Sequence, residues 1–480
     1  MSNKNKLKYN SSPCGSGKTS EVFNVIKENI EQKFLLIQGT KALIDESKRT
    51  LLTVHGIVAT AIYSTGDKGD NVMDRITKFH QEPTSRVLII TDKTFWNLSI
   101  SLLSSYKIYI DDVVSFSVFK TINEKETHIR AFVRRRVFNE LKDVASSIDS
   151  KGNATYVTTT KKEQEGDLYK SLQKEFRITE QNDKFFMNKS WFKYSAVEQL
   201  SIFAYKDLTK YMGLDITFMA NDFENSLIYL AYQDLFERVD WNLRTRTIPL
   251  KDRLAVKYFS KGDLSATWKE NNPQKLKTVY DYLNTELNGS KFLWTKNKKD
   301  GDQYTLLGKY ISPDSRGLND YQDYKTCVWL ASMKPAPTEQ ACLEHAFDIT
   351  GAQIVQAREL ETLHQFVMRG VIRDYDSTEI QTVYVFSEEQ AKSLVSDPQY
   401  IDLGLDDDEP KKLGAPVKTV TIPPHITKRK CVFINKCKDE GIEVTHPMFK
   451  EWVAKKCEDT SIEVQESMIA NFMKKHGNPG

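Results

Sequence analysis

Residues 12–19 read Ser12-Pro13-Cys14-Gly15-Ser16-Gly17-Lys18-Thr19. The preceding run, Leu7 to Asn10, is typical of a short strand. Apolar side chains follow at helical spacing, at Val22, Val25, Ile26 and Ile30. The two glycines therefore fall where a strand turns into a helix, which is the context that a phosphate-binding loop requires.

The chemistry of this loop predicts a site for ATP and Mg²⁺. Gly15 and Gly17 let backbone N–H groups approach phosphate oxygens closely, and the N-terminus of the next helix adds partial positive charge. Lys18 is expected to reach the β and γ phosphates, and the Thr19 hydroxyl to ligate the metal. Every residue from Ser12 to Thr19 is predicted to contribute to nucleotide binding. The alternative is an ordinary Gly/Ser turn.

Three further apolar runs predict a parallel sheet around the loop. They are Phe34–Gln38, Val87–Ile90 and Ile108–Ile110, and polar residues follow each of them. Such runs are typical of strands buried on both faces, and their alternation with helices indicates a doubly wound α/β fold. Because Asp111 and Asp112 end the third run, we expect Asp111 to hold Mg²⁺ and Asp112 to orient or deprotonate the attacking water. A helix N-cap or surface turn is the alternative.

The rest of the chain predicts a second α/β unit and two less regular parts. Residues 115–214 show helical patterns and polar stretches, which favour a largely helical insertion. Strand-like runs return at Asp215–Asn221, Leu254–Phe259, Phe292–Thr295, Thr326–Leu330 and Thr382–Phe386. We therefore expect a first domain at 1–235, a second at 236–395, a linker at 396–422 and a small helical C-terminal module at 423–480.

A helix predicted from Glu361 to Arg373 carries Gln365, Arg369 and Arg373 at four-residue intervals. This spacing places the three side chains on roughly one face. An arginine delivered across a cleft stabilises the charge on a γ phosphate in transit and can contribute about 10³ to 10⁵ in rate. The resemblance described below implies that this face completes the ATP site from the second domain. A surface helix with salt bridges is the alternative.

Composition bounds the class of protein. The chain has 480 residues, 40% of them hydrophobic and 28% charged, which is typical of a globular protein with two or three domains. No apolar run approaches the ~18 residues of a membrane span, and the first residues lack the apolar core of a secretory signal. We therefore expect a cytoplasmic protein without a membrane partner.

Charge and cysteine usage are less specific. A net charge of +3 does not identify a nucleic-acid binder. Basic clusters at 134–136, 296–299 and 428–430 are candidates for phosphate contacts or simply solvated faces. The cysteines form no Cys-x-x-Cys pair, and the spacing of Cys431, Cys437, His446 and Cys457 matches no common zinc pattern.

The order of these motifs resembles superfamily 2 helicases of the DEAD/DEAH-like kind, particularly the compact helicases of bacteriophage replication regions. The resemblance covers roughly residues 7–390 and implies two RecA-like domains. Asp111-Asp112 stands where the family usually has Asp-Glu, and Met219-Ala220-Asn221 where it has a Ser-Ala-Thr-like element. The family's second arginine normally follows the first after three residues, and here it follows after four. The finger is therefore Arg369 or Arg373, and we choose Arg373.

The resemblance also implies roles for single residues. The expected catalytic residues are Lys18, Asp111, Asp112, Gln365, Arg369 and Arg373. Gly317 and Asn319 are expected to contact the nucleotide from the second domain. The expected nucleic-acid contacts are Gly39, Thr40, Lys41, Thr91, Lys93, Ser312 and Arg316.

The leading hypothesis is an ATP-driven helicase or translocase on single-stranded or forked DNA, with RNA possible, in phage replication or recombination in the host cytoplasm. An alternative is a nucleic-acid-stimulated ATPase that remodels protein–nucleic-acid complexes without unwinding. A phosphotransferase for a small metabolite and a binding protein with a degenerate ATPase are further alternatives. The insertion, with Arg134 to Arg136, Trp191 and Phe192, is a candidate for guiding a strand, although such aromatics are more often core. The C-terminal module is a candidate for docking a replication protein.

Overall fold

The computed structural model describes residues 6–67, 70–123, 133–143, 156–161, 176–188, 191–192, 199–318, 320–406, 424–440, 442, 444–456, 465 and 468–469. The chain divides into two compact units, Met1–Leu405 and Asp406–Gly480. Among the helices of the described part, none is both long enough and apolar enough to cross a bilayer.

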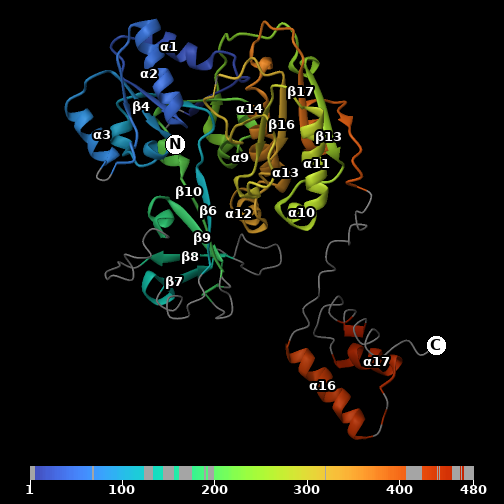
Figure 1. The fold of residues 1–480 in the computed structure, drawn as a ribbon. Helices are drawn as coiled ribbons and strands as arrows, with labels where there is room; N and C mark the ends of the chain where they lie inside the picture. The colour runs from blue at the N-terminus through green and yellow to red at the C-terminus, as the bar shows by residue number, and fades with distance from the viewer. Residues whose placement is uncertain are drawn as a thin grey trace. The chain divides into compact units, whose positions relative to one another are not determined.

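A seven-stranded parallel sheet carries the phosphate loop (Figure 1). In spatial order its strands are β12 (Phe236–Arg238), β1 (Leu7–Ser11), β11 (Asp215–Ala220), β5 (Lys107–Asp111), β2 (Phe34–Gln38), β4 (Val87–Thr91) and β3 (Ala59–Ile62). The associated helices are α1 (Lys18–Glu28), α2 (Lys41–His55), α3 (Val72–Gln81), α4 (Asp92–Phe95), α5 (Ile100–Leu103) and α9 (Leu227–Tyr232). Alternate residues of β2 enter different apolar clusters, Leu35 and Ile37 in one, Phe34 and Leu36 in the other. Both faces of this sheet are therefore buried. We call this sheet and its helices the first lobe.

A second, six-stranded sheet is also parallel throughout. Its strands, in spatial order, are β15 (Lys309–Tyr310), β14 (Leu293–Lys296), β16 (Thr326–Leu330), β17 (Gln381–Ser387), β13 (Leu254–Ser260) and β18 (Gln399–Tyr400). The helices of this part are α10 (Ala266–Asn271), α11 (Pro273–Glu286), α14 (Glu361–Val367) and α15 (Glu388–Leu394). Helices α12 (Pro337–Phe347) and α13 (Gly351–Val355) follow β16 in the chain, but they bury Cys342, Leu343 and Ile354 in the core of the first lobe. Short turns of 3-10 helix are η3 (Leu208–Tyr211), η4 (Phe223–Asn225), η5 (Gln233–Leu235), η6 (Leu250–Arg253), η7 (Lys298–Asp300) and η9 (Val371–Arg373). We call the six-stranded sheet with α10, α11, α14 and α15 the second lobe; the turns η3, η4 and η5 belong to the earlier part of the chain. The two parallel sheets with their helices confirm the predicted fold class of two RecA-like α/β domains.

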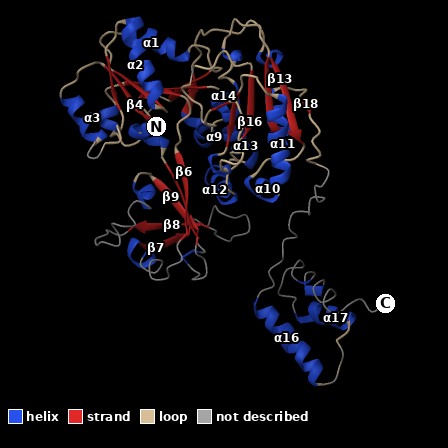
Figure 2. Cartoon of the chain, in the orientation of Figure 1, coloured by secondary structure: helices blue, strands red, loops and turns tan. Residues whose placement is uncertain are grey.

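The insertion differs from the prediction of a largely helical segment. Its described residues form a five-stranded antiparallel sheet (Figure 2). The strands are β6 (Ser117–Asn123), β10 (Gln199–Tyr205), β9 (Lys184–Asn188), β8 (Tyr156–Lys161) and β7 (Phe138–Asp143). The apolar spacing that suggested a helix is divided between a π turn, η1 (Val133–Val137), and β7. The prediction was wrong for this part because β6 pairs with β10 across most of the insertion, and local periodicity does not report such pairing.

The predicted helix from Glu361 to Arg373 is also wrong in extent. Helix α14 follows a π turn, η8 (Gln356–Leu360), and ends at Val367, whereas Arg373 lies in the separate turn η9. Gly370 separates them in extended backbone, and a Cβ there would lie only 2.1 Å from the amide oxygen of buried Gln381. Gln381 of β17 also donates from Nε2 to the carbonyl of Val367, the last residue of the helix, at 2.8 Å.

The structure also bears on the boundary of the first domain and on Trp191, an aromatic of the kind that is more often core. Strand β12 joins the first sheet beside β1, so that sheet extends beyond the expected boundary at residue 235. Trp191 is only 1% exposed and belongs to the core of the insertion, so it offers no stacking surface to a strand. Arg134 lies over its ring, 4.8 Å from the centroid, while the side chains of Arg135 and Arg136 lie outside the described residues.

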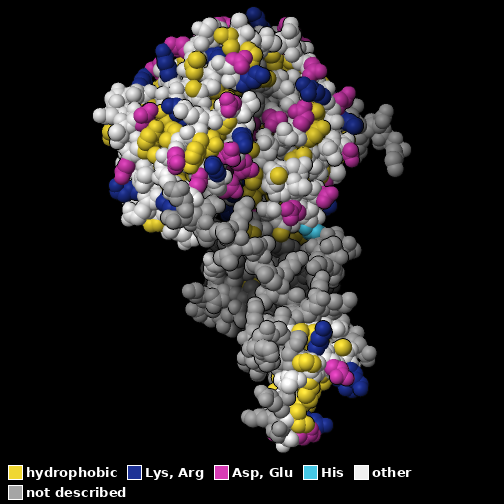
Figure 3. Space-filling model, turned by 90° about the vertical axis from the view of Figure 1, so that its right-hand side faces the viewer, with side chains coloured by type: hydrophobic (Ala, Val, Ile, Leu, Met, Phe, Trp, Pro, Cys, Tyr) yellow, Lys and Arg dark blue, Asp and Glu magenta, His cyan; other side chains and the backbone are white. Residues whose placement is uncertain are grey.

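Other basic clusters are partly engaged by backbone. Lys296 turns inward and donates to the carbonyls of Gly301 and Tyr304, both at 2.5 Å. Over the described part of the face in Figure 3, basic and acidic side chains of the larger unit are interspersed, which fits the small net charge of +3.

The smaller unit contains α16 (Pro424–Asp439) and α17 (His446–Lys456). Phe449, Val453 and Met468 are buried together, and Phe433 stacks on Trp452 with ring centroids 4.8 Å apart. No cluster of three metal-ligating side chains occurs in the part of the chain that the structure describes, which leaves out Cys457 and the side chains of Cys431 and His446.

Candidate functional site

The phosphate loop joins the end of β1 to the start of α1. Gly15 and Gly17 have φ values of 81° and 96°, a left-handed conformation that favours glycine. The loop is held to the neighbouring strand because Ser12 N donates to Ala220 O at 2.9 Å. The Lys18 ammonium folds back and donates to the carbonyls of Ser12 and Pro13 at 2.6 and 3.0 Å. The Lys18 charge therefore lies over the loop.

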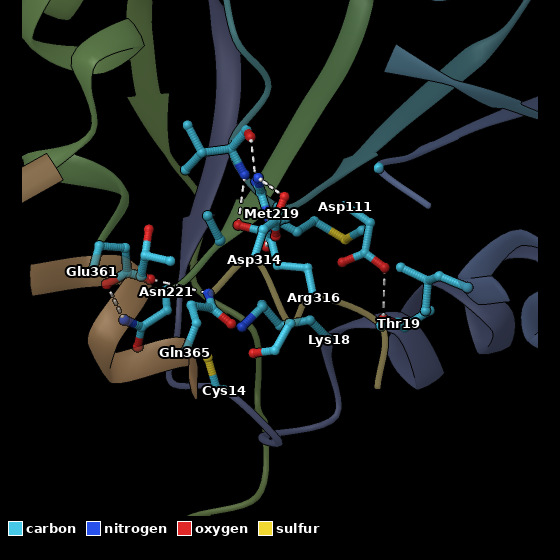
Figure 4. Close-up of a pocket in the computed structure, with 18 of the residues that line it drawn as sticks. Cys14, Lys18, Thr19, Asp111, Met219, Asn221, Asp314, Arg316, Glu361 and Gln365 are labelled. Carbon is cyan, nitrogen blue, oxygen red and sulfur yellow. Dashed lines mark hydrogen bonds and ion pairs between the residues drawn. The ribbon is translucent and has the colours of Figure 1, made fainter. Parts of the chain in front are cut away.

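A cavity of about 910 Å³ lies next to the loop and is lined by both lobes (Figure 4). From the first lobe it is lined by Cys14, Gly15, Gly17, Lys18, Thr19, Gly39, Thr40, Lys93, Asp111 and Asp112. From the second lobe it is lined by Arg316, Gly317, Gln365, Arg369 and Arg373. The described residues Ser12, Pro13, Ser16, Lys41, Thr91 and Ser312 do not line it. Asn319 lies outside the described residues.

Thr19 and Asp111 meet at the end of β5. The Thr19 hydroxyl donates to Asp111 Oδ2 at 3.2 Å, and Gln38 Nε2 donates to the same oxygen at 3.2 Å. Burial raises the pKa of Asp111, and the neighbouring charge of Asp112 adds to this effect. A hydroxyl and a carboxylate are hard oxygen ligands of the kind that Mg²⁺ accepts beside phosphate oxygens, so this pair fits that ion.

Asp112 has a φ of 78°, which is uncommon for a residue other than glycine. Its N–H donates to Met219 O at 2.8 Å, and its Oδ1 accepts from Val113 N at 2.7 Å. The other oxygen, Oδ2, lies 3.9 Å from Arg316 Nε of the second lobe. The strand-to-turn backbone therefore aims one carboxylate oxygen across the cavity.

Arg316 is itself held by two hydrogen bonds to Asp314, at 2.7 and 2.9 Å, and donates to Val113 O at 3.2 Å. Burial alone lowers the pKa of Arg316, but the bonds to Asp314 and the charge of Asp112 outweigh it and raise that pKa. This arginine therefore stays charged beside Asp112.

The segment from Glu361 to Arg369 forms a hydrogen-bonded row. Arg369 is only 4% exposed and donates to Leu318 O at 2.9 Å and to Gln365 Oε1 at 3.2 Å. Burial lowers the pKa of Arg369 to about 10, with a further contribution from the charge of Arg373. Gln365 Nε2 donates to Glu361 Oε1 at 3.0 Å. The sequence prediction placed Gln365 and Arg369 in the site but not Glu361, which the four-residue spacing to Gln365 could have indicated.

The turn after η9 lies against the phosphate loop. Tyr375 donates its hydroxyl to Cys14 O at 2.9 Å, and a Cβ on Gly15 would lie 3.1 Å from its ring. The same Cβ would lie 3.8 Å from Arg373 Cγ, so Arg373 is next to the loop. The Arg246 guanidinium lies 3.9 Å from the centroid of the Tyr375 ring. Nothing in the spacing of the sequence pointed to Tyr375 or Arg246.

The residues predicted to contact nucleic acid lie in several local structures. Thr40 caps α2 by accepting from Leu43 N at 3.2 Å, and Thr91 caps α4 by accepting from Thr94 N at 3.3 Å. A Cβ on Gly317 would lie 2.8 Å from Thr40 Oγ1, so the two lobes touch closely at this point. Lys93 is exposed at the cavity.

Comparisons with known proteins add information about one lobe. Residues 245–395 match a family model described as the YonV C-terminal Rossmann-like domain. A search of curated proteins returned no match. Among solved structures, the chain is similar to one titled XPD helicase, with 12% identity, a TM-score of 0.47, and coverage of 83% of this chain and 96% of that one.

Two further solved structures illustrate the range of matches. Xpd4 of S. tokodaii has 12% identity and a TM-score of 0.43, with coverage of 82% of this chain and 96% of that one. The DEAD-box helicase Mss116, solved with single-stranded RNA and UDP-BeF, has 9% identity and a TM-score of 0.36, with coverage of 94% and 77%.

Proposed function

We propose that the chain is a nucleic-acid-dependent ATP hydrolase that works on single strands as a helicase or translocase. The observation that carries the proposal is a cavity lined by the phosphate loop of the first lobe and by Gln365, Arg369 and Arg373 of the second. A site divided in this way is closed around a triphosphate and free to open after hydrolysis, which links ATP turnover to movement of the lobes.

In this proposal each side chain has a stated task. Lys18 exchanges its bonds with two loop carbonyls for bonds with the β and γ phosphates. Thr19 and Asp111 hold Mg²⁺, which would neutralise charge on the phosphate oxygens. Asp112 orients the water through the oxygen that faces the cavity.

The proposed arginine finger is Arg373. Arg369 already donates to Leu318 O and twice to Gln365, and it is almost fully buried. Arg373 lies beside Gly15, where a γ phosphate held by the loop would be within its reach. We therefore assign Arg369 to holding the segment in place and Arg373 to the transferring phosphate.

The nucleic-acid part of the proposal rests on the resemblance of motif order. We propose DNA before RNA, and a role in phage replication or recombination. The proposed strand contacts remain Gly39, Thr40, Lys41, Thr91, Lys93, Ser312 and Arg316. A replication protein that docks on the C-terminal unit is part of the same proposal.

The test is steady-state ATP hydrolysis by the full chain, alone and with single-stranded DNA or RNA. We expect turnover to rise with one of the two polymers, and Lys18→Ala to lose turnover in every condition. An ATP hydrolysis rate that neither DNA nor RNA changes would favour a phosphotransferase and contradict the proposal. A forked duplex then separates unwinding from remodelling, because only a helicase releases the displaced strand.

A further inference from the structure

A row of polar side chains that line the cavity crosses from one lobe to the other. Asn221, just after β11 of the first lobe, places its Nδ2 2.8 Å from Glu361 Oε2. Glu361 Oε1 accepts from Gln365 Nε2 at 3.0 Å, and Gln365 Oε1 accepts from Arg369 at 3.2 Å. Figure 4 shows Asn221, Glu361 and Gln365 side by side.

The donors and acceptors of this row leave little freedom. Arg369 only donates, so it fixes the carbonyl end of the Gln365 amide toward itself. The amide nitrogen of Gln365 must then face Glu361, which has to accept from it. The row therefore needs an acceptor on residue 361 toward Gln365, whereas the Asn221 amide can turn to offer either end.

Glu361 also sits at a junction in the backbone. The π turn η8 precedes it, and within that turn Glu359 is anchored in the second lobe through Met333 N at 2.7 Å and Gln390 Nε2 at 2.8 Å. The backbone of Glu361 thus belongs to the second lobe, whereas its partner Asn221 belongs to the first lobe. π turns inside helices occur frequently at functional sites.

We propose that Glu361 is a positioning residue, which ties Asn221 of the first lobe to Gln365 and Arg369 and so sets the place of the segment that carries Arg373. The proposal deepens the proposed ATPase function and rests on it. Glu361 has no role in holding the phosphates, because its two oxygens are engaged by Asn221 and Gln365. A displacement of about 1 Å in a catalytic group costs about 10²-fold in rate, so the expected effect is on turnover rather than on ATP affinity.

The test uses the single variants Glu361→Ala, Glu361→Gln and Asn221→Ala, and the double variant that combines Glu361→Ala with Asn221→Ala. Gln at this position still accepts from Gln365 and can donate to a turned Asn221, so the row survives. Ala removes both contacts. A matched control is Glu344→Gln on α12, where Glu344 accepts from Gln340 at 2.8 Å on the surface. Readouts are kcat and KM for ATP, and hydrogen exchange of the backbone amides at 366–373.

We expect Glu361→Ala to lower kcat by about 10- to 100-fold with KM within about threefold of wild type. Glu361→Gln should stay within about threefold in kcat, and Asn221→Ala should add little to Glu361→Ala because both break one row. Hydrogen exchange of the backbone amides at 366–373 should be faster than wild type in Glu361→Ala and unchanged in Glu361→Gln.

Three results would overturn the inference: wild-type kcat and exchange in Glu361→Ala, a Glu361→Gln variant as impaired as Glu361→Ala, or independent effects of Asn221→Ala and Glu361→Ala. The exchange measurement needs no ATP. A wild-type chain without ATPase activity would therefore refute the proposed function, while exchange would still decide whether Glu361 positions the segment.

Discussion

The contact between Arg316 and Asp112 leads to a prediction about ATP turnover without nucleic acid. Arg316 Nε lies 3.9 Å from Asp112 Oδ2, the oxygen proposed to receive the attacking water. A charge pair at this distance is worth about 4 kcal/mol at an effective dielectric constant of 20 and about 1 kcal/mol in bulk water. Because the Arg316 side chain is 39% exposed, we discount the attraction to about 1–2 kcal/mol.

If this attraction must be given up before Asp112 engages the water, then Arg316→Ala should raise the basal rate by about 5- to 30-fold. Because Arg316 is also a proposed strand contact, the stimulation by single-stranded DNA should shrink in the same variant. The assay is steady-state ATP hydrolysis with and without an oligonucleotide. Arg238→Ala is the matched control, since Arg238 makes surface ion pairs with Glu224 and Asp240 at 2.9 Å.

A basal rate in Arg316→Ala that is unchanged or lower than wild type would refute this reasoning. It would mean that Arg316 assists hydrolysis in the resting arrangement instead of restraining Asp112. Thermal unfolding of both variants shows whether a lowered rate reflects a loss of folded protein.

Three other predictions follow from the same site. Asp112→Asn should remove most ATP turnover, because an amide cannot accept a proton from the water, and Asp112→Glu should retain it; full activity of the Asn variant would exclude Asp112 from this role. Arg373→Ala should lower kcat by about 10³-fold with little change in melting temperature. Arg369→Ala should lower the melting temperature, because it leaves the Leu318 carbonyl and the Gln365 amide oxygen without this donor. The reverse pattern would exchange the two assignments. Burial raises the pKa of Glu361 to about 8, and the charge of Asp112 adds to the shift. The folded state therefore binds a proton that the unfolded state has released, so the free energy of unfolding should fall between about pH 4.5 and pH 8 by up to about 1.4 kcal/mol per pH unit. Chemical denaturation of wild type and Glu361→Gln across this range checks the sign, since the variant should lose this slope.

Local sequence was sufficient for the elements that build the first lobe. The phosphate loop, the buried runs of β2 and β4, and the carboxylates at the end of β5 carry short-range signals. Burial on both faces demands near-continuous apolar residues, and a tight strand-to-helix turn demands glycine. These signals do not depend on where distant segments lie, so they could be found without the structure.

Long-range packing decided what local patterns could not. The insertion pairs β6 with β10 across intervening chain, and helix α14 ends at Val367, whose carbonyl accepts from Gln381 of β17. Asn221 and Glu361 meet across 140 positions of sequence, and no periodicity within either segment reports the other. Contacts between lobes depend on how two separately formed sheets face each other, and this arrangement appears only when the whole chain is folded.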